Sequence, residues 1–401
     1  MTRMTTAEPE LKIEPGKLPS WPQYDDTERT ALSRALDQGQ WWRVGGQEVE
    51  LFEQEFARYQ GAPYALAVNS GTAALELALR INGIGPGDEV IVPAFTFIST
   101  SLAVQNVGAT PVPADVDPGN YCLTPEAVRA ALTGRTRAMI PVHMAGHVAD
   151  LPGLSRIAAE RGLILIQDAA HAQGAVRDGA LIGAHPTVAC YSFQNGKLMT
   201  AGEGGALTFP DEKSYEQAYL MHTCGRPRGD VRYNHTTGGS NHRITEFTGA
   251  VLRAQLARLA AQTVIRERRA GLLDELLSGV PGLSVQGRDP EMAVNPHYMY
   301  LLTLDEAFGR EGRDRMVTDL MAAGIPACVN FPPVYRTPGF GHGPRPTTSE
   351  AELAERCAVS ERVGAHGLWV HHRVLLAEPE VIEEVAEVIS TLVGRLPAAG
   401  A

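Results

Sequence analysis

Short apolar runs alternate with amphipathic stretches along the first half of the chain. The apolar runs have the length of buried strands and lie at residues 64–68, 89–92, 111–114, 138–143, 163–167, 188–193 and 205–209. Segments with helical spacing at 72–81, 98–107 and 151–161 separate several of them, and each is followed by a glycine that can end a helix. This alternation predicts an α/β fold with a doubly wound, mostly parallel sheet, in which ligands bind at the carboxyl ends of the strands.

The chain has 401 residues, more than a single hydrophobic core usually organises, so we expect a large and a smaller domain. A long helical stretch at 246–277 leads from one into the other. We place the large domain at 19–265 and a smaller α+β domain at 266–401. Residues 1–18 are polar, contain proline and show no periodicity, which predicts a flexible N-terminal arm.

Composition argues against several classes of protein. The formal net charge of −11 disfavours a nucleic-acid partner. No apolar run approaches the ~18 residues of a membrane helix, and the N-terminus lacks the apolar core of a signal peptide. The five cysteines are odd in number and far apart, which is typical of free thiols in the cytoplasm. His143 and His147 lie across a strand end and a glycine, so we expect no metal site there.

A lysine surrounded by small residues lies just past the strand expected at 188–193. The segment from Tyr191 to Gly205 reads YSFQNGKLMTAGEGG, with Lys197 at its centre. The small neighbours leave this lysine room to reach an aldehyde, and burial can lower its pKa so that the amine acts as nucleophile and then as base. An exposed lysine in a flexible loop is the alternative interpretation.

Three other segments place complementary groups near the same edge of the sheet. Asp168 ends an apolar strand, where it can pair with the pyridine nitrogen of pyridoxal 5′-phosphate (PLP) or cap the next helix. Gly71 and Thr72 open a helix whose N–H groups can bind phosphate, although an ordinary helix cap also explains them. Phe97 follows a strand and can stack on a flat ring or fill the core. Together with Lys197, these residues predict a PLP enzyme that handles an amino group.

Taken in order, the segments resemble the DegT/DnrJ/EryC1/StrS aminotransferase family, of the fold type I PLP-dependent transferases. The resemblance covers roughly residues 20–395. Its most specific part is 192–205, which carries the family pattern S-F-x-x-x-K-x-x-T-x-G-E-G-G at every fixed position. The resemblance implies that Lys197 holds PLP as a Schiff base and that Asp168 contacts the pyridine nitrogen. His171 falls near the ring hydroxyl, where many relatives have glutamine.

The resemblance also implies the remaining cofactor contacts. Phe97 corresponds to the aromatic residue that stacks on the ring, and Gly71, Thr72 and Ser192 correspond to phosphate ligands. Asn241, in the segment Gly-Ser-Asn-His-Arg, corresponds to an asparagine that reaches the phosphate of the neighbouring subunit. The implied assembly is therefore a homodimer with shared active sites.

Within the family, several segments resemble the branch that makes an aromatic aminohydroxybenzoate for ansamycin-type antibiotics. They are residues 39–43, 93–99, 141–146, 192–205, 224–228 and 369–373. This branch dehydrates and aromatises an amino-dehydroshikimate-like carbocycle.

Segment 329–336, expected to bound the substrate pocket, departs from that branch and keeps a second hypothesis open. The alternative is an aminotransferase acting on a keto-sugar nucleotide or keto-cyclitol, with glutamate or glutamine as amino donor. A non-catalytic PLP-binding regulator is a third hypothesis. The retained Lys197 and the lack of a basic DNA-binding module count against it.

Overall fold

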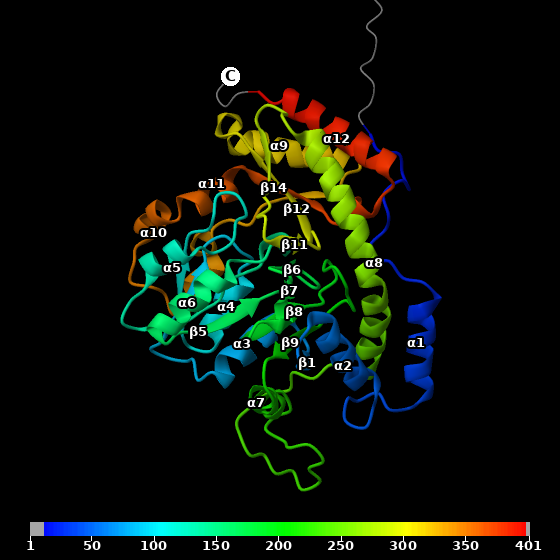
Figure 1. The fold of residues 1–401 in the computed structure, drawn as a ribbon, viewed down its shortest axis with the longest axis vertical. Helices are drawn as coiled ribbons and strands as arrows, with labels where there is room; N and C mark the ends of the chain where they lie inside the picture. Colours follow the sequence, from blue (N-terminus) through cyan, green and yellow to red (C-terminus); the bar gives the residue numbers. More distant parts are fainter. Residues whose placement is uncertain (1–11, 398–401) are drawn as a thin grey trace, which may run out of the picture.

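A computed structural model describes residues 12–397 of the chain (Figure 1). Its centre is a seven-stranded sheet in which β9 runs antiparallel to both of its neighbours and the other pairs are parallel. In spatial order the strands are β1 (Tyr64–Val68), β9 (Gly205–Phe209), β8 (Val188–Ser192), β5 (Ile164–Asp168), β4 (Thr136–Met139), β2 (Glu89–Pro93) and β3 (Thr110–Ala114). All seven overlap the apolar runs of the sequence, although β4 begins two residues before its run and ends four before the end of it, so the expected doubly wound sheet is confirmed.

Helices cover both faces of this sheet. One face packs against α3 (Gly71–Ile81), α4 (Ser99–Asn106) and α7 (Glu212–His222). The other face packs against α2 (Glu48–Gln60), α5 (Pro125–Ala131), α6 (Leu151–Arg161) and the first half of α8 (Glu246–Leu277). Gly83, Gly108 and Gly162, expected to follow helices, all adopt the left-handed backbone conformation that lets a chain leave a helix. Because helices lie on both faces, only the strand ends remain open for a site.

Helix α8 joins the two domains. Its residues Leu252, Leu256 and Leu259 belong to the core of the large domain, whereas Ala270 and Leu273 belong to the core of the small one. The helix therefore crosses the boundary that we place at 265/266. In Figure 1 it runs beside both domains, with α1 (Asp26–Asp37) along its outer side near the large domain.

The small domain is built on an antiparallel four-stranded sheet. Its strands are ordered β10 (Leu283–Val285), β12 (Met299–Leu304), β14 (Gly367–His371) and β13 (Ala327–Val329). Helices α9 (Gly309–Ala322) and α12 (Pro379–Gly394) pack on it together with the end of α8. Helices α10 (Glu350–Arg356) and α11 (Ala358–His366) connect β13 to β14. In a third, small sheet, β6 (Val176–Arg177) lies between β11 (Met292–Val294) and β7 (Ala180–Leu181).

The N-terminal segment differs from its expected form in the part that the structure describes. Ile13 is buried in the small-domain core, and its N–H donates to the carbonyl of Ala323 at 2.9 Å. Lys17 Nζ lies 2.7 Å from the carboxylate of Glu384 on α12. Residues 12–18, which we expected to be loose, are thus held to the small domain by the buried Ile13, by its backbone hydrogen bond and by the ion pair from Lys17 to Glu384. Residues 1–11 lie outside the described residues.

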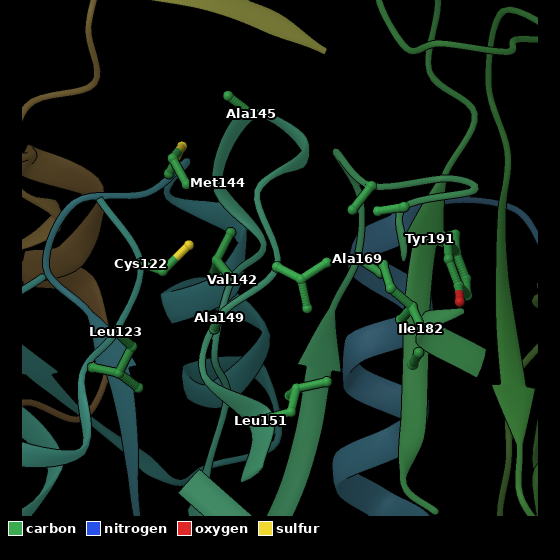
Figure 2. Packing of buried hydrophobic residues seen from close by; sticks show 14 of the residues in the cluster. Cys122, Leu123, Val142, Met144, Ala145, Ala149, Leu151, Ala169, Ile182 and Tyr191 are labelled. Carbon is green, nitrogen blue, oxygen red and sulfur yellow. The ribbon is translucent and has the colours of Figure 1, made fainter. Parts of the chain in front are cut away.

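The buried core continues up to the carboxyl ends of the parallel strands. Figure 2 shows Val142, Ala169 and Tyr191 among the apolar side chains packed there. Within residues 12–397, no helix combines the length and apolar character needed to cross a membrane. The packed strand ends form the floor of a cavity at this edge of the sheet.

Candidate active site

A cavity of about 390 Å³ opens at the carboxyl ends of β2, β5 and β8. Seven of the eight residues singled out from the sequence line it, and only Asn241 does not. The seven are Gly71, Thr72, Phe97, Asp168, His171, Ser192 and Lys197. The topology explains this gathering, because parallel strands deliver the residues that follow them to one edge of the sheet.

Asp168, the last residue of β5, presents a buried carboxylate to the cavity. Thr100 Oγ1 donates to its Oδ2 at 2.7 Å, and the N–H of Ala170 donates to its Oδ1 at 3.2 Å. Burial raises the pKa of the carboxyl, while the bonds from Thr100 and Ala170 and the charge of Lys197 oppose that rise. No Lys or Arg of residues 12–397 forms an ion pair with this carboxylate, so a protonated pyridine nitrogen would supply the cation that the site lacks.

Lys197 follows a tight turn after β8. Its backbone N–H donates to the carbonyl of Gln194 at 2.8 Å, which closes the turn. Its Nζ lies 4.1 Å from the ring centroid of Tyr298, a small-domain residue just before β12. The two domains thus meet at this amine, which is half-buried and faces the cavity.

His171 adds a neutral polar ring beside the lysine. Its imidazole stacks on Tyr298 with the centroids 4.3 Å apart and an angle of 25° between the planes. Burial lowers the pKa of His171 well below its usual value, and the charges of Lys197 and His143 lower it further. Its buried Nδ1 has no hydrogen-bond partner among the described residues. A polar atom buried without a partner is expensive, so a ligand hydroxyl at this position would satisfy it.

Backbone N–H groups at the start of α3 and the Ser192 side chain form a narrow cradle in the lining of the cavity. The Ser70 side chain caps α3 by accepting from Ala73 N–H at 3.0 Å, which leaves the N–H groups of Gly71 and Thr72 at the helix start for a ligand. A Cβ at Gly71 would lie 2.8 Å from the Cβ of Ser192. The absence of a side chain at Gly71 therefore lets the start of α3 lie against Ser192, which brings the backbone N–H groups and the serine side chain together.

Aromatic side chains form the wall of the cavity. Phe97 is 53% exposed at the mouth, and its ring meets that of Phe331 edge-on with the centroids 5.8 Å apart. Tyr298 and Trp369, both from the small domain, complete the wall. Reasoning from the sequence missed Tyr298, and it placed Phe331 and Trp369 only within segments 329–336 and 369–373.

Asn241 lies outside the cavity of its own chain. It is exposed and forms an isolated antiparallel bridge with Thr223. The carbonyl of its neighbour His242 accepts from the N–H of Asn69, 2.8 Å away and just before the phosphate cradle. Its role toward a second subunit stays a prediction.

The histidines considered as metal ligands have other partners. His143 is buried, and its Nε2 lies 3.0 Å from Oε1 of Gln167. His147 lies 3.6 Å from the carboxylate of Asp289. Across residues 12–397, no group of three or more His, Cys, Asp or Glu side chains is arranged to hold a metal ion.

The cavity fits PLP on three independent observations. Its buried carboxylate forms no ion pair with a Lys or Arg of the described chain, its glycine–serine cradle leaves the first N–H groups of α3 for a ligand, and the Lys197 amine lines the same cavity. Asp168, Gly71 with Ser192, and Lys197 would hold the ring nitrogen, the phosphate and the aldehyde carbon respectively.

Comparison with known proteins extends this assignment to the whole chain. Residues 23–392 match the DegT/DnrJ/EryC1/StrS aminotransferase family. The chain is 51% identical over 381 residues to the 3-amino-5-hydroxybenzoate synthase of Amycolatopsis mediterranei, covering 94% of this chain and 98% of that protein. It is 40% identical to the dTDP-3-amino-3,4,6-trideoxy-alpha-D-glucose transaminase of Streptomyces venezuelae, covering 84% and 86% of the two chains.

Solved structures agree with the sequence comparison. The crystal structure of a 3-amino-5-hydroxybenzoic acid (AHBA) synthase superposes with a TM-score of 0.92 at 52% identity, covering 94% of this chain and 99% of that one. The Streptomyces venezuelae enzyme DesV, in complex with a ketimine intermediate, superposes with a TM-score of 0.83 at 35% identity, covering 92% and 95%. The chain belongs to the DegT/DnrJ/EryC1/StrS aminotransferase family and is a fold type I, PLP-dependent enzyme.

Proposed function

We propose that this enzyme converts an amino-dehydroshikimate-like carbocycle into 3-amino-5-hydroxybenzoate by dehydration and aromatisation, for antibiotic biosynthesis. The net change is the loss of one water, so the reaction needs no oxidant or reductant. The similarity to the Amycolatopsis synthase supports this reaction over the others known in the family. The observation that carries the proposal is the aromatic wall around Lys197, formed by Phe97, Tyr298, Phe331 and Trp369.

An aromatic wall suits a flat or nearly flat six-membered ring, because faces and edges of aromatic side chains pack against it and exclude water. Among the described residues that line the cavity, Lys197 is the only Lys or Arg. A sugar nucleotide carries a diphosphate, and enzymes bind such groups with cations or helix N-termini. The helix N-terminus at Gly71 is already assigned to the cofactor's phosphate. The other helix start in the lining, that of α4 at Ser99, lies beside the Asp168 carboxylate, to which Thr100 is hydrogen-bonded.

In this proposal, the residues that line the cavity have distinct roles. When bound, PLP supplies an electron sink for the carbon beside the substrate's amino group. Lys197 is placed to hold the cofactor and to move a proton at that carbon. Asp168 keeps positive charge at the ring nitrogen, and Thr100 orients the carboxylate through its 2.7 Å hydrogen bond. His171, whose buried Nδ1 has no partner among the described residues, would face the ring hydroxyl when PLP is bound.

An aminotransferase acting on a keto-sugar nucleotide or keto-cyclitol is the alternative. Relatives with this kind of printed activity support it, including the L-glutamine:2-deoxy-scyllo-inosose aminotransferase of Streptomyces kanamyceticus, at 34% identity. Both reactions would use the same lysine, aspartate and phosphate cradle. The two reactions therefore differ in the substrate that the aromatic wall of the cavity accepts.

One paired assay tests the proposal. The enzyme loaded with PLP is incubated with an aminodehydroshikimate, and the ultraviolet absorbance of an aromatic product is followed. In parallel it is incubated with a keto-sugar nucleotide or keto-cyclitol plus glutamine. We expect the aromatic product in the first arm; turnover confined to the second arm would favour the aminotransferase.

We also infer that the working unit is a homodimer in the cytoplasm. Asn241 is exposed and outside its own cavity, as expected of a residue that serves a partner's site. Trp41 and Trp42 are 52% and 47% exposed, and Trp42 pairs with Thr245, four residues from Asn241. Exposed tryptophans beside a functional loop suit a subunit interface.

A further inference from the structure

The turn that carries Lys197 is held from outside by two residues distant in sequence. Trp21 Nε1–H donates to the carbonyl of Asn195 at 2.8 Å. His372 Nε2 lies 3.1 Å from the carbonyl of Gly196. Trp21 comes from the segment before α1, and His372 immediately follows β14 of the small domain. Neither residue lines the cavity, so neither is accounted for by contacts to cofactor or substrate.

The hydrogen bond from His372 fixes its tautomer. A backbone carbonyl can only accept, so Nε2 must carry the proton. The ring is fully buried, and this burial, together with the charges of Arg266, His371 and Lys197, holds the pKa of His372 well below the usual value. His372 is therefore a neutral donor whose function does not depend on a change of its own charge.

Packing joins the two residues into one unit. The Trp21 ring meets the His372 ring edge-on, at 85° with centroids 4.4 Å apart. On the other side, His372 lies 6.0 Å from the ring of Tyr298, which in turn contacts the Lys197 amine. Trp21 and His372 thus hold the turn at two consecutive carbonyls, and the Lys197 side chain of this turn contacts the Tyr298 ring.

We propose that Trp21 and His372 are positioning residues that hold the turn 194–197, so that the Lys197 amine stays over the Tyr298 ring and faces the cavity. The inference rests on the proposed role of Lys197 in holding PLP. Without the His372 hydrogen bond, the Gly196 carbonyl would lose its partner, and the lysine would sample orientations away from the cavity. The Lys197 amine would then react more slowly with the aldehyde of PLP.

Two measurements on the full-length chain test this without measuring turnover. The first is hydrogen exchange of the 194–197 amides in the protein freed of PLP, which needs no assumption about Lys197. The second is the rate at which added PLP becomes fixed on Lys197 by borohydride, mapped by peptide mass. The chain has four lysines, Lys12, Lys17, Lys197 and Lys213, so the attachment site is unambiguous.

The variants separate positioning from folding. His372→Leu removes the donor, whereas His372→Gln keeps an N–H near the Nε2 position. His371→Gln is the matched control, because His371 is the adjacent histidine but accepts from Arg373 N–H and makes no hydrogen bond to the turn. Trp21→Phe keeps an aromatic edge and removes only the bond to Asn195.

We expect His372→Leu to speed exchange at 194–197 and slow PLP fixation, each by about fivefold, the worth of one hydrogen bond. His372→Gln and His371→Gln should stay within about twofold of the parent protein, and Trp21→Phe should lie between. Unchanged exchange in His372→Leu, or an equal defect in His372→Gln, would overturn the proposal. Fixation of PLP on another lysine would refute the role of Lys197. The hydrogen-exchange result would still show whether His372 holds the turn 194–197.

Discussion

Thr100 and Asp168 are joined by a hydrogen bond of 2.7 Å from the threonine hydroxyl to the buried carboxylate. Thr100 lies in the first turn of α4, and Asp168 is the last residue of β5. The bond ties a helix start to a strand end across the floor of the cavity. It stabilises the charged carboxylate against the effect of burial, which raises the pKa of Asp168.

Replacing Asp168 by asparagine should leave part of the PLP bound and remove most activity. The amide retains the shape of the carboxylate but cannot stabilise a protonated ring nitrogen, so the ring becomes a poor electron sink. We expect a loss of at least ~100-fold in kcat, comparable to the removal of a strong electrostatic contact. Steady-state kinetics beside PLP content measure both effects; parental kinetics in this variant would refute the assigned role.

Replacing Thr100 by valine should have a smaller effect of the same kind. The variant keeps the shape of the side chain and loses a hydrogen bond to a charged group, worth about 1.5–3 kcal/mol, which corresponds to roughly 10- to 100-fold in rate if the bond matters fully in the transition state. Ser101→Ala is the control, because Ser101 is equally buried and its hydroxyl has no partner among the described residues. Equal kinetics for the two variants would show that Thr100 does not orient the carboxylate.

The sequence predicted the sheet and its site well because both depend on local patterns. Each buried strand is a short apolar run, and the residues that follow parallel strands meet at one edge. The positions of Lys197, Asp168 and Gly71 at one edge of the sheet therefore follow from the sequence.

Tyr298 could not be found in this way, and Trp369 and His372 were placed only within segment 369–373. They reach the site from the small domain, and the packing of one domain on another depends on contacts between residues far apart in sequence. Ile13 escaped prediction for a similar reason: a single apolar residue in a polar segment shows no period, yet it finds a place in the small-domain core.

Replacing Lys197 by alanine should abolish turnover and the covalent attachment of PLP. The variant lacks the amine that we propose holds the aldehyde carbon and moves the proton. The purified parent protein should be yellow, and borohydride should fix PLP on a single peptide containing Lys197. Lys213→Ala, a change at an exposed position on α7, should behave like the parent. A label on any other lysine would contradict the assignment.

Acid should destabilise the protein as its buried histidines become protonated on unfolding. Burial lowers the pKa of His143 to about 4, whereas a histidine in an unfolded chain titrates near about 6.5. Between these values the unfolded chain binds a proton that the folded chain does not, so the free energy of unfolding falls as the pH decreases from about 6.5 to about 4. His371, whose pKa is also lowered to about 4, acts in the same direction.

His143→Gln should reduce this acid sensitivity. Between pH 7 and pH 5, His143 alone should account for about 2 kcal/mol of the decrease in unfolding free energy. Urea titrations at the two pH values measure the difference, with His342→Gln, at an exposed position, as control. The idea fails if both variants lose as much stability as the parent on acidification.

Mixing two inactive variants should restore activity if the active sites are shared between subunits. Asn241 is exposed and lies outside the cavity of its own chain, while Lys197 lines that cavity. In a hybrid dimer of Lys197→Ala and Asn241→Ala chains, one site would carry both lesions and the other neither. With equal mixing and free exchange, half of the dimers are hybrids with one intact site, so about a quarter of the parental activity should return. Subunit exchange is verified separately by mass, and each variant mixed with itself is the control. No recovery after verified exchange would mean that Asn241 serves its own chain's site or none, because only a site built from two chains can be repaired by a partner.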